Sequence, residues 1–202
     1  MTRPQQADVV VVSAADTTLA PPTSLAELGQ RIVVLGVTGS GKSTLAGELA
    51  RRLGVPHVEL DALHWEPNWT PAQRAVLRER VQRATASEGW VVDGNYSQTR
   101  DLVWPRAQTI IWLDYSLPVI FARLLRRTVW RTLARVELWS GNRERLWPQF
   151  LTRDSLFLWA LTSRPNQRRE YPSIPSNPDY AHITFLRLRS PRATARWLAA
   201  LR

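Results

Sequence analysis

The chain has 202 residues, 44% of them apolar, enough for one α/β domain with a sizeable core but few for two full domains. It has no cysteine, which excludes disulfides and thiolate metal sites. No apolar run approaches the ~18 residues that span a bilayer. The valines at 9–12 form too short a run, with Asp8 before it and Asp16 after it, for a secretory signal, so we expect a cytoplasmic protein with no membrane partner.

The formal net charge of +10 makes nucleic acid a candidate partner. Of the 27 basic residues, all except Lys42 are arginine. Between positions 123 and 169 the sequence has eleven arginines and only three acidic residues, so the basic residues are concentrated in one segment. Because no nucleic-acid reader motif is evident either, nucleic acid is not the favoured partner. The sequence does not indicate an oligomeric state.

Residues 1–30 are rich in Pro, Thr, Ala and Ser, which predicts a flexible N-terminal tail. Addition of 9–12 to a sheet as a short strand is the alternative. From residue 31 onward, strand-like apolar runs alternate with helical patterns, which is typical of a mainly parallel sheet covered by helices. Residues 31–202 should therefore form one α/β domain.

Five strands are expected, at 32–35, 57–60, 90–93, 109–113 and 183–188. The expected helices run over 42–53, from 70 to about 87, from 116 onward and from 191 onward. Gly54 marks the end of the first helix, and Thr70-Pro71-Ala72-Gln73 has the form of a capping box that opens the second. An α-helical insert, about 128–170, separates the fourth strand from the fifth.

The run GVTGSGKS at 36–43 follows a strand and opens a helix, which is the context of a phosphate-binding loop. Its glycines let backbone N–H groups point at phosphate oxygens, and the helix start adds partial positive charge. Lys42 would reach the β- and γ-phosphates of ATP, and the Ser43 hydroxyl would bind Mg²⁺. The other candidate ATP contacts are Gly36, Thr38, Gly39, Ser40, Gly41 and Thr44. An accidental glycine turn is the alternative.

Two aspartates end strands at the edge where ligands of open parallel sheets gather. Asp93 could hold Mg²⁺ through water beside Ser43, or it could cap a turn. Asp114 has a similar position but comes just before the helix start at Ser116. A carboxylate is favoured there by the helix dipole, whatever its function.

Asp61 follows the second strand and could accept the proton of an attacking hydroxyl, or orient that hydroxyl. Trp65 and Trp69 could wall an acceptor pocket by stacking, with His64 beside them. The alternative is an N-cap followed by two core tryptophans, and a histidine of this kind is more often structural than catalytic.

Arginines at 123, 127, 131 and 135 recur every four residues and share one helical stripe. Arg143, Arg145 and Arg153 follow in the insert. Arginine forks aimed at the charge that develops in phosphoryl transfer can raise the rate by ~10³ or more. A solvated basic face is the alternative for any single arginine of the group.

With these residues the chain resembles the adenylate kinase and shikimate kinase-like P-loop kinases, over roughly 31–200. It is most similar to their branch named DNA topology modulation proteins. The resemblance rests on the motifs at 36–44, LDALHW at 60–65, WVVDGNY at 90–96, RLLRR at 123–127 and SGNRE at 140–144. The resemblance implies a three-layer fold, a parallel sheet of order 2-3-1-4-5 and a lid after the fourth strand.

The resemblance also implies roles for individual residues. Arg123 would stack on adenine, Arg127 and the lid arginines would contact phosphates, and Asp61 would hold the acceptor hydroxyl. Asp93-Gly94 is similar to the Asp-Gly of nucleoside monophosphate kinases, but those kinases place an arginine soon after it, whereas here Arg100 is the next one. Asn95, Tyr96 and Arg100 are therefore acceptor-binding candidates for an acceptor that need not be a nucleotide.

Three functions fit the sequence. The favoured one is a kinase that uses ATP and Mg²⁺ to phosphorylate a small molecule or nucleotide, with Lys42, Asp61, Arg127, Arg143, Arg145 and Arg153 in catalytic roles. The others are a nucleic-acid-associated P-loop ATPase or regulator and a nucleotide-binding protein without transfer activity.

Overall fold

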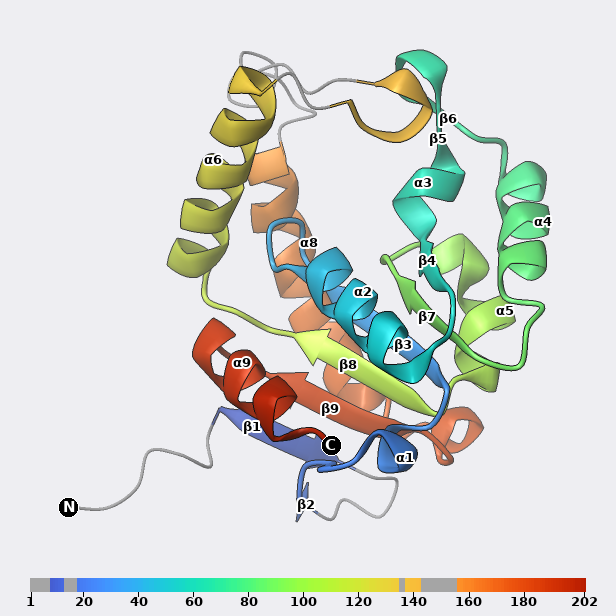
Figure 1. Ribbon diagram of the computed structural model, residues 1–202, viewed down its shortest axis with the longest axis vertical. Coiled ribbons are helices and arrows are strands. Elements are labelled where there is room, and N and C mark those ends of the chain that lie inside the picture. Colours follow the sequence, from blue (N-terminus) through green and yellow to red (C-terminus); the bar gives the residue numbers. More distant parts are fainter. Residues whose placement is uncertain (1–7, 13–17, 135–136, 143–155) are drawn as a thin grey trace.

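The centre of the protein is a sheet whose five parallel strands lie in the order β4-β7-β3-β8-β9. Their bounds are Arg31–Gly36 (β3), His57–Glu59 (β4), Trp90–Asp93 (β7), Thr109–Leu113 (β8) and Thr184–Leu188 (β9). Numbered along the chain, this is the expected order 2-3-1-4-5. The computed structural model describes residues 8–12, 18–134, 137–142 and 156–202 (Figure 1).

The expectation of a flexible tail over 1–30 is wrong for part of that segment. Strand β1 (Val9–Val12) pairs antiparallel with β9, and β2 (Thr18–Leu19) pairs with β1, which extends the sheet to seven strands. Consecutive valines suit a strand, and the edge of β9 supplies partners for their backbone. Val11 is 1% exposed. For residues 9–12 the alternative prediction, addition to the sheet as a short strand, is therefore the correct one. A short helix, α1 (Leu25–Leu28), leads into β3.

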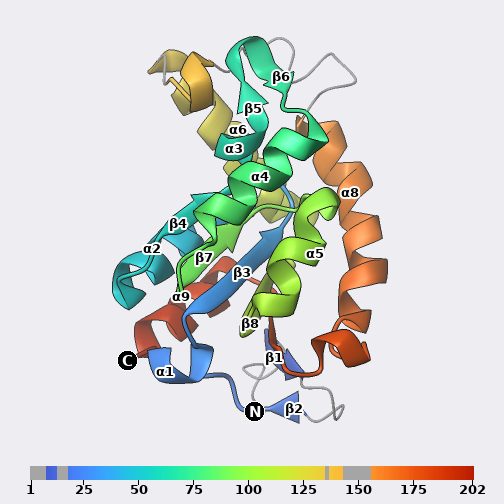
Figure 2. The same cartoon turned by 90° about the vertical axis from the view of Figure 1, so that its right-hand side faces the viewer.

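Helices cover both faces of the sheet, which confirms the three-layer α/β fold (Figures 1 and 2). One core contains Ile32 and Val34 with residues of α2 (Lys42–Leu53) and α9 (Pro191–Ala200). The other contains Val33 and Leu35 with residues of α4 (Arg74–Ala84) and α5 (Arg100–Val103). Neighbouring residues of β3 thus enter opposite cores, as strand geometry requires.

Two long helices belong to the region after β8. Helix α6 (Leu117–Leu133) begins after Ser116, as expected, and α8 (Leu156–Glu170) returns the chain towards β9. In Figure 1, α6 rises away from the sheet at the end of β8, whereas α8 runs down behind the strands. Within the described ranges, no helix has the length and apolar character needed to cross a membrane.

The capping box expected at Thr70 does not form. Thr70–Pro71 is strand β6, which pairs antiparallel with β5 (Trp65–Glu66) across a 3₁₀ turn at Pro67–Trp69. Asn68 and Trp69 have φ values of 61° and 57°, so the backbone reverses direction there. Because Thr70 belongs to this hairpin, α4 starts four residues later at Arg74, and it ends at Ala84 rather than near residue 87.

Asp114 has neither of the roles considered from the sequence. Its carboxylate is buried and accepts hydrogen bonds from Arg168 Nε at 2.8 Å and Arg187 Nε at 3.1 Å, with Arg164 Nη2 at 3.7 Å. Burial and then the charge of Arg168 lower the pKa of Arg164, while Asp114 opposes them. One carboxylate therefore ties α8 and β9 to the end of β8.

Substitution of Asp114 should show that this carboxylate stabilises the fold. In Asp114→Ala three arginines would crowd together without their shared anion, so we expect a loss of about 3 kcal/mol in the free energy of unfolding. Urea denaturation measures it. Asp179→Ala, at a residue of the short 178–180 turn for which no arginine contact is recorded, is the control and should change stability by less than ~0.5 kcal/mol. Equal stabilities of the two variants would contradict the assignment.

Candidate nucleotide and acceptor site

The loop between β3 and α2 has the geometry of an anion cradle. Gly39 and Gly41 have φ values of 79° and 94°, the left-handed region that favours glycine. A Cβ on Gly41 would lie 2.6 Å from Nη2 at the flexible end of Arg123, so the φ of 94°, more than the available space, is what favours glycine there. No side chain caps the start of α2, which leaves its first-turn N–H groups for a ligand.

The side chains of the loop also fit the expectation of a phosphate site. Lys42 Nζ lies 3.5 Å from the carbonyl oxygen of Val37, a long contact within the loop itself. Ser40 is 1% exposed, and its hydroxyl has no hydrogen-bond partner in the described part of the chain. Ser43 and Thr44 are exposed in the first turn of α2.

Helix α6 packs directly against this loop. A Cβ on Gly39 would lie 3.2 Å from the Ile120 carbonyl oxygen, and the guanidinium of Arg127 donates to Thr38 Oγ1 at 3.4 Å. The guanidinium of Arg123, beside Gly41, lies 5.9 Å from the ring centre of Tyr115. Two members of the predicted arginine stripe therefore reach the loop. Arg143, Arg145 and Arg153 lie outside the described residues.

Asp93 ends β7 next to the loop, and each of its carboxylate oxygens has a partner. Ser43 Oγ donates to Oδ1 at 3.1 Å, and His57 Nε2 lies 2.7 Å from Oδ2. Burial would lower the pKa of His57, but the hydrogen bond to Asp93 and the charges of Asp93 and Glu59 outweigh it and raise the pKa. Sequence reasoning missed His57, although a histidine in a short buried strand was a signal.

Hydroxyl and carboxylate oxygens are ligands that Mg²⁺ prefers, and Ser43 and Asp93 provide one of each. Across the described ranges, no group of three or more His, Asp or Glu side chains is placed to hold a metal ion. Mg²⁺ sites in nucleotide-binding proteins are commonly completed by phosphate oxygens and water. The Ser43–Asp93 pair therefore fits a metal that is held jointly with a nucleotide.

Asp61 lies in α3 (Leu60–His64), which directly follows the carboxyl end of β4. The Tyr96 hydroxyl donates to Asp61 Oδ1 at 2.6 Å. Burial and then the charge of Asp61 raise the pKa of Tyr96, so the phenol stays protonated and remains a donor. A Cβ on Gly94 would lie 2.7 Å from Leu60 Cβ, so the glycine lets the end of β7 approach α3. Tyr96 thus fixes one Asp61 oxygen.

Aromatic rings gather beside Asp61. The His64 ring centre lies 4.8 Å from that of Trp65 and 4.7 Å from that of Tyr96, and Trp65 lies 5.6 Å from Trp69. Burial lowers the pKa of His64, with Asp61 opposing it. The two tryptophans are half-buried, and they are not members of either core. The structure therefore brings together the aromatic residues that the sequence suggested for an acceptor wall.

A turn at 139–142, between α6 and α8, docks on the hairpin that carries Trp65 and Trp69. Asn142 accepts a hydrogen bond from Trp69 N at 2.9 Å and donates to the Glu66 carbonyl oxygen at 2.9 Å. Ser140 Oγ donates to the Trp65 carbonyl oxygen at 2.8 Å. Among the described non-glycine residues, those with positive φ are Asn68, Trp69 and Ser140, all at this contact. Sequence reasoning did not identify this function of Asn142.

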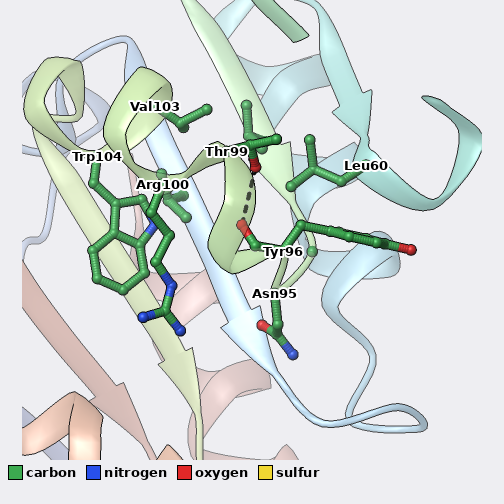
Figure 3. A pocket seen from close by; sticks show the side chains of 10 residues that line it. Leu60, Asn95, Tyr96, Thr99, Arg100, Val103 and Trp104 are labelled. Carbon is green, nitrogen blue, oxygen red and sulfur yellow. Dashed lines mark hydrogen bonds between the residues drawn. The ribbon is translucent and has the colours of Figure 1, made fainter. Parts of the chain in front are cut away.

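Asn95 and Arg100 already have protein partners. The Asn95 amide donates to the Gly36 carbonyl oxygen at 2.6 Å and accepts from Gly36 N at 3.3 Å, which ties β7 to the start of the phosphate loop. Arg100 pairs with Glu170 of α8 and lies 4.6 Å from the ring centre of Trp104. Both residues line a small cavity with Tyr96, whose ring extends away from Trp104 (Figure 3).

Several known proteins are similar to this chain. A shikimate kinase of Rhodopseudomonas palustris is 28% identical over 143 residues, which are 61% of this chain and 69% of that protein. The structure of a shikimate kinase from Acinetobacter baumannii in complex with shikimate has a TM-score of 0.50 at 14% identity, covering 88% of this chain and 94% of that one. A gluconokinase from Sinorhizobium meliloti has a TM-score of 0.49 at 22% identity, covering 86% and 93%.

The likeness to the Acinetobacter structure shows that the fold is that of the P-loop kinases. The sequence also matches a protein family described as "AAA domain" over residues 32–132. This match runs from β3 through the phosphate loop and almost to the end of α6, which is half of the chain. The protein therefore belongs to this AAA domain family.

Proposed function

We propose that this protein is a kinase that transfers the γ-phosphoryl group of ATP to a hydroxyl group of a small-molecule or nucleotide acceptor. One observation carries the proposal. The phosphate loop with its Ser43–Asp93 pair and Asp61 with its aromatic neighbours all lie at the carboxyl ends of the parallel strands. A donor site and an acceptor site side by side are what phosphoryl transfer requires. The kinase name of the Rhodopseudomonas relative supports the same class of reaction.

On the donor side, the first-turn N–H groups of α2 and Lys42 would bind the phosphates of ATP. Ser43 and Asp93 would hold Mg²⁺, which when bound neutralises charge on the β- and γ-phosphates. Arg123, beside Gly41, would stack on the adenine, and Arg127, beside Thr38, would contact phosphate. Arg143, Arg145 and Arg153 remain proposed phosphate contacts.

On the acceptor side, Asp61 would orient the attacking hydroxyl and accept its proton. Tyr96 donates to Oδ1 of Asp61, so Oδ2 would be the oxygen that receives the acceptor hydroxyl. His64, Trp65 and Trp69 would pack on the acceptor, so a ring-bearing molecule with a hydroxyl group suits this wall. Asn95 would act by holding Gly36, and Arg100 through its contacts at the edge of the cavity.

Within the P-loop kinases, we place the chain in the branch named DNA topology modulation proteins, on its motifs at 60–65 and 90–96. The name of that branch does not guide the choice of acceptor. The charge of +10 by itself does not favour a nucleic-acid partner either, because no nucleic-acid reader motif accompanies it in the sequence. A cytoplasmic location would supply the ATP.

The donor site can be tested with Lys42→Ala. Loss of the ammonium group should abolish the calorimetric heat of Mg·ATP binding and reduce ADP release with any acceptor by about 100-fold or more, because Lys42 is the group proposed to reach both the β- and γ-phosphates from within the loop. Arg196→Ala, on the exposed side of α9, is the matched control and should behave as wild type. Absence of ATP binding by the wild-type protein would refute the proposal.

The acceptor site can be tested with Asp61→Asn, which keeps the shape of the side chain but removes the base. Affinity for Mg·ATP should stay within about twofold, since Asp61 does not touch the phosphate loop, while acceptor-dependent ADP release should fall by about 100-fold or more. Acceptor classes are screened with the wild-type protein first.

Tyr96→Phe serves as the comparison for Asp61→Asn. It removes one hydrogen bond to Asp61 and leaves the ring, so a loss of only about tenfold is expected. Undiminished transfer in Asp61→Asn would show that another group accepts the proton.

A further inference from the structure

His57 has no role in the proposed function, although it makes the shortest contact to Asp93. Its Nε2 lies 2.7 Å from Asp93 Oδ2, and the Asp93 side chain is 3% exposed. Strands β4 and β7 set this contact, because Glu59 pairs with Asp93 in the parallel ladder and His57 lies two residues before Glu59, on the same face. The contact is thus determined by the core of the sheet rather than by a loop.

We infer that His57 is a positioning residue that holds the carboxylate of Asp93 in the orientation that binds the Mg²⁺ of Mg·ATP. The inference rests on the proposed function. The two Asp93 oxygens are divided between two partners, with Oδ1 towards Ser43 and Oδ2 towards His57. A donor on Oδ2 fixes the rotation of the carboxylate and so fixes where Oδ1 points.

Ser43 and His57 would hold Asp93 in different ways during nucleotide binding. A serine hydroxyl that binds a metal ion through its oxygen can still donate its proton to a carboxylate, so Ser43 would couple Oδ1 to the metal ion. His57 holds the other oxygen, and it does so from strand β4 rather than through the ligand. Groups that orient a metal ligand in this way commonly contribute 10–100-fold to metal affinity.

The surroundings of His57 favour donation towards Asp93. Its other ring nitrogen, Nδ1, lies 4.0 Å from Glu59 Oε1, beyond hydrogen-bond distance. Burial and then the charge of Asp93 raise the pKa of Glu59, whereas His57 lowers it. The imidazole is packed beside Gly47 of α2, whose Cβ position would lie 3.5 Å from Nδ1, an ordinary contact. The ring is therefore held on the Asp93 side by its neighbours.

The test compares two amide substitutions of different length. In His57→Gln the side-chain amide nitrogen can take the place of Nε2 and still donate to Asp93. In His57→Asn the amide nitrogen corresponds to Nδ1 and falls short of Asp93. His182→Gln is the matched control, because His182 is exposed and contacts only the Pro105 carbonyl oxygen in the recorded hydrogen bonds.

Isothermal titration calorimetry would measure the affinity for ATP with Mg²⁺ and again with EDTA, in all four proteins. The quantity of interest is the gain in affinity that Mg²⁺ produces. We expect His57→Asn to lose about tenfold or more of this gain, with an unchanged affinity in EDTA. His57→Gln should stay within about threefold of wild type, and His182→Gln should match it.

The outcomes separate the inference from the proposed function. If the wild-type protein does not bind ATP, the proposed function fails. If Mg²⁺ strengthens ATP binding equally in wild type and in His57→Asn, only the inference about His57 is overturned. Thermal unfolding is recorded for each variant. If His57→Asn does not fold, His57→Phe replaces it, because phenylalanine keeps a ring but has no donor, and a full Mg²⁺ gain there would overturn the inference.

Discussion

The parallel pairing of β3 with β7 is the constraint on which the site depends. It places Asp93 opposite Val34, two residues before the phosphate loop begins at Gly36. The Asn95 amide then joins the two strand ends through two hydrogen bonds to the Gly36 backbone. Since β4 pairs with β7 on the other side, His57 and the Asp61 helix reach the same edge. The groups proposed to bind nucleotide and those proposed to face the acceptor are thereby attached to one sheet.

The chain between β8 and β9 contacts both sides of this edge. Helix α6 lies on the phosphate loop through Arg123 and Arg127, and the turn at 139–142 then binds the hairpin of Trp65 and Trp69. The left-handed backbone conformations of the turn and the hairpin are costly for non-glycine residues, and the hydrogen bonds of Asn142 stabilise them. Helix α6 and the turn at 139–142 therefore reach the proposed donor side and the proposed acceptor side of the site, respectively.

The arginine-rich composition serves two purposes. Arg164, Arg168 and Arg187 converge on the buried carboxylate of Asp114, and Arg100 pairs with Glu170. These contacts hold α8 against the sheet, and a planar guanidinium with several donors suits such shared ion pairs. Arg123 and Arg127 of α6 instead lie at the phosphate loop, beside Gly41 and Thr38, although α6 is far from that loop in the sequence. Net charge alone does not distinguish these purposes.

The sequence by itself determined the parallel strands, the bounds of α2 and the phosphate loop, because these depend on local signals such as runs of β-branched residues, Gly54 and the glycine spacing at 36–41. It also grouped Asp61 with its tryptophans, which are close along the chain. Only the tertiary structure decided that β1 joins the sheet, that Thr70 belongs to a hairpin, and that His57, Asn142 and Asp114 hold their partners. The hairpin of Thr70 is local, pairing Glu66 with Thr70, but a capping-box pattern does not reveal it. The other contacts join residues far apart along the chain, 36 positions for His57 and Asp93 and 73 for Asn142 and Trp69, and no local pattern encodes such a pairing.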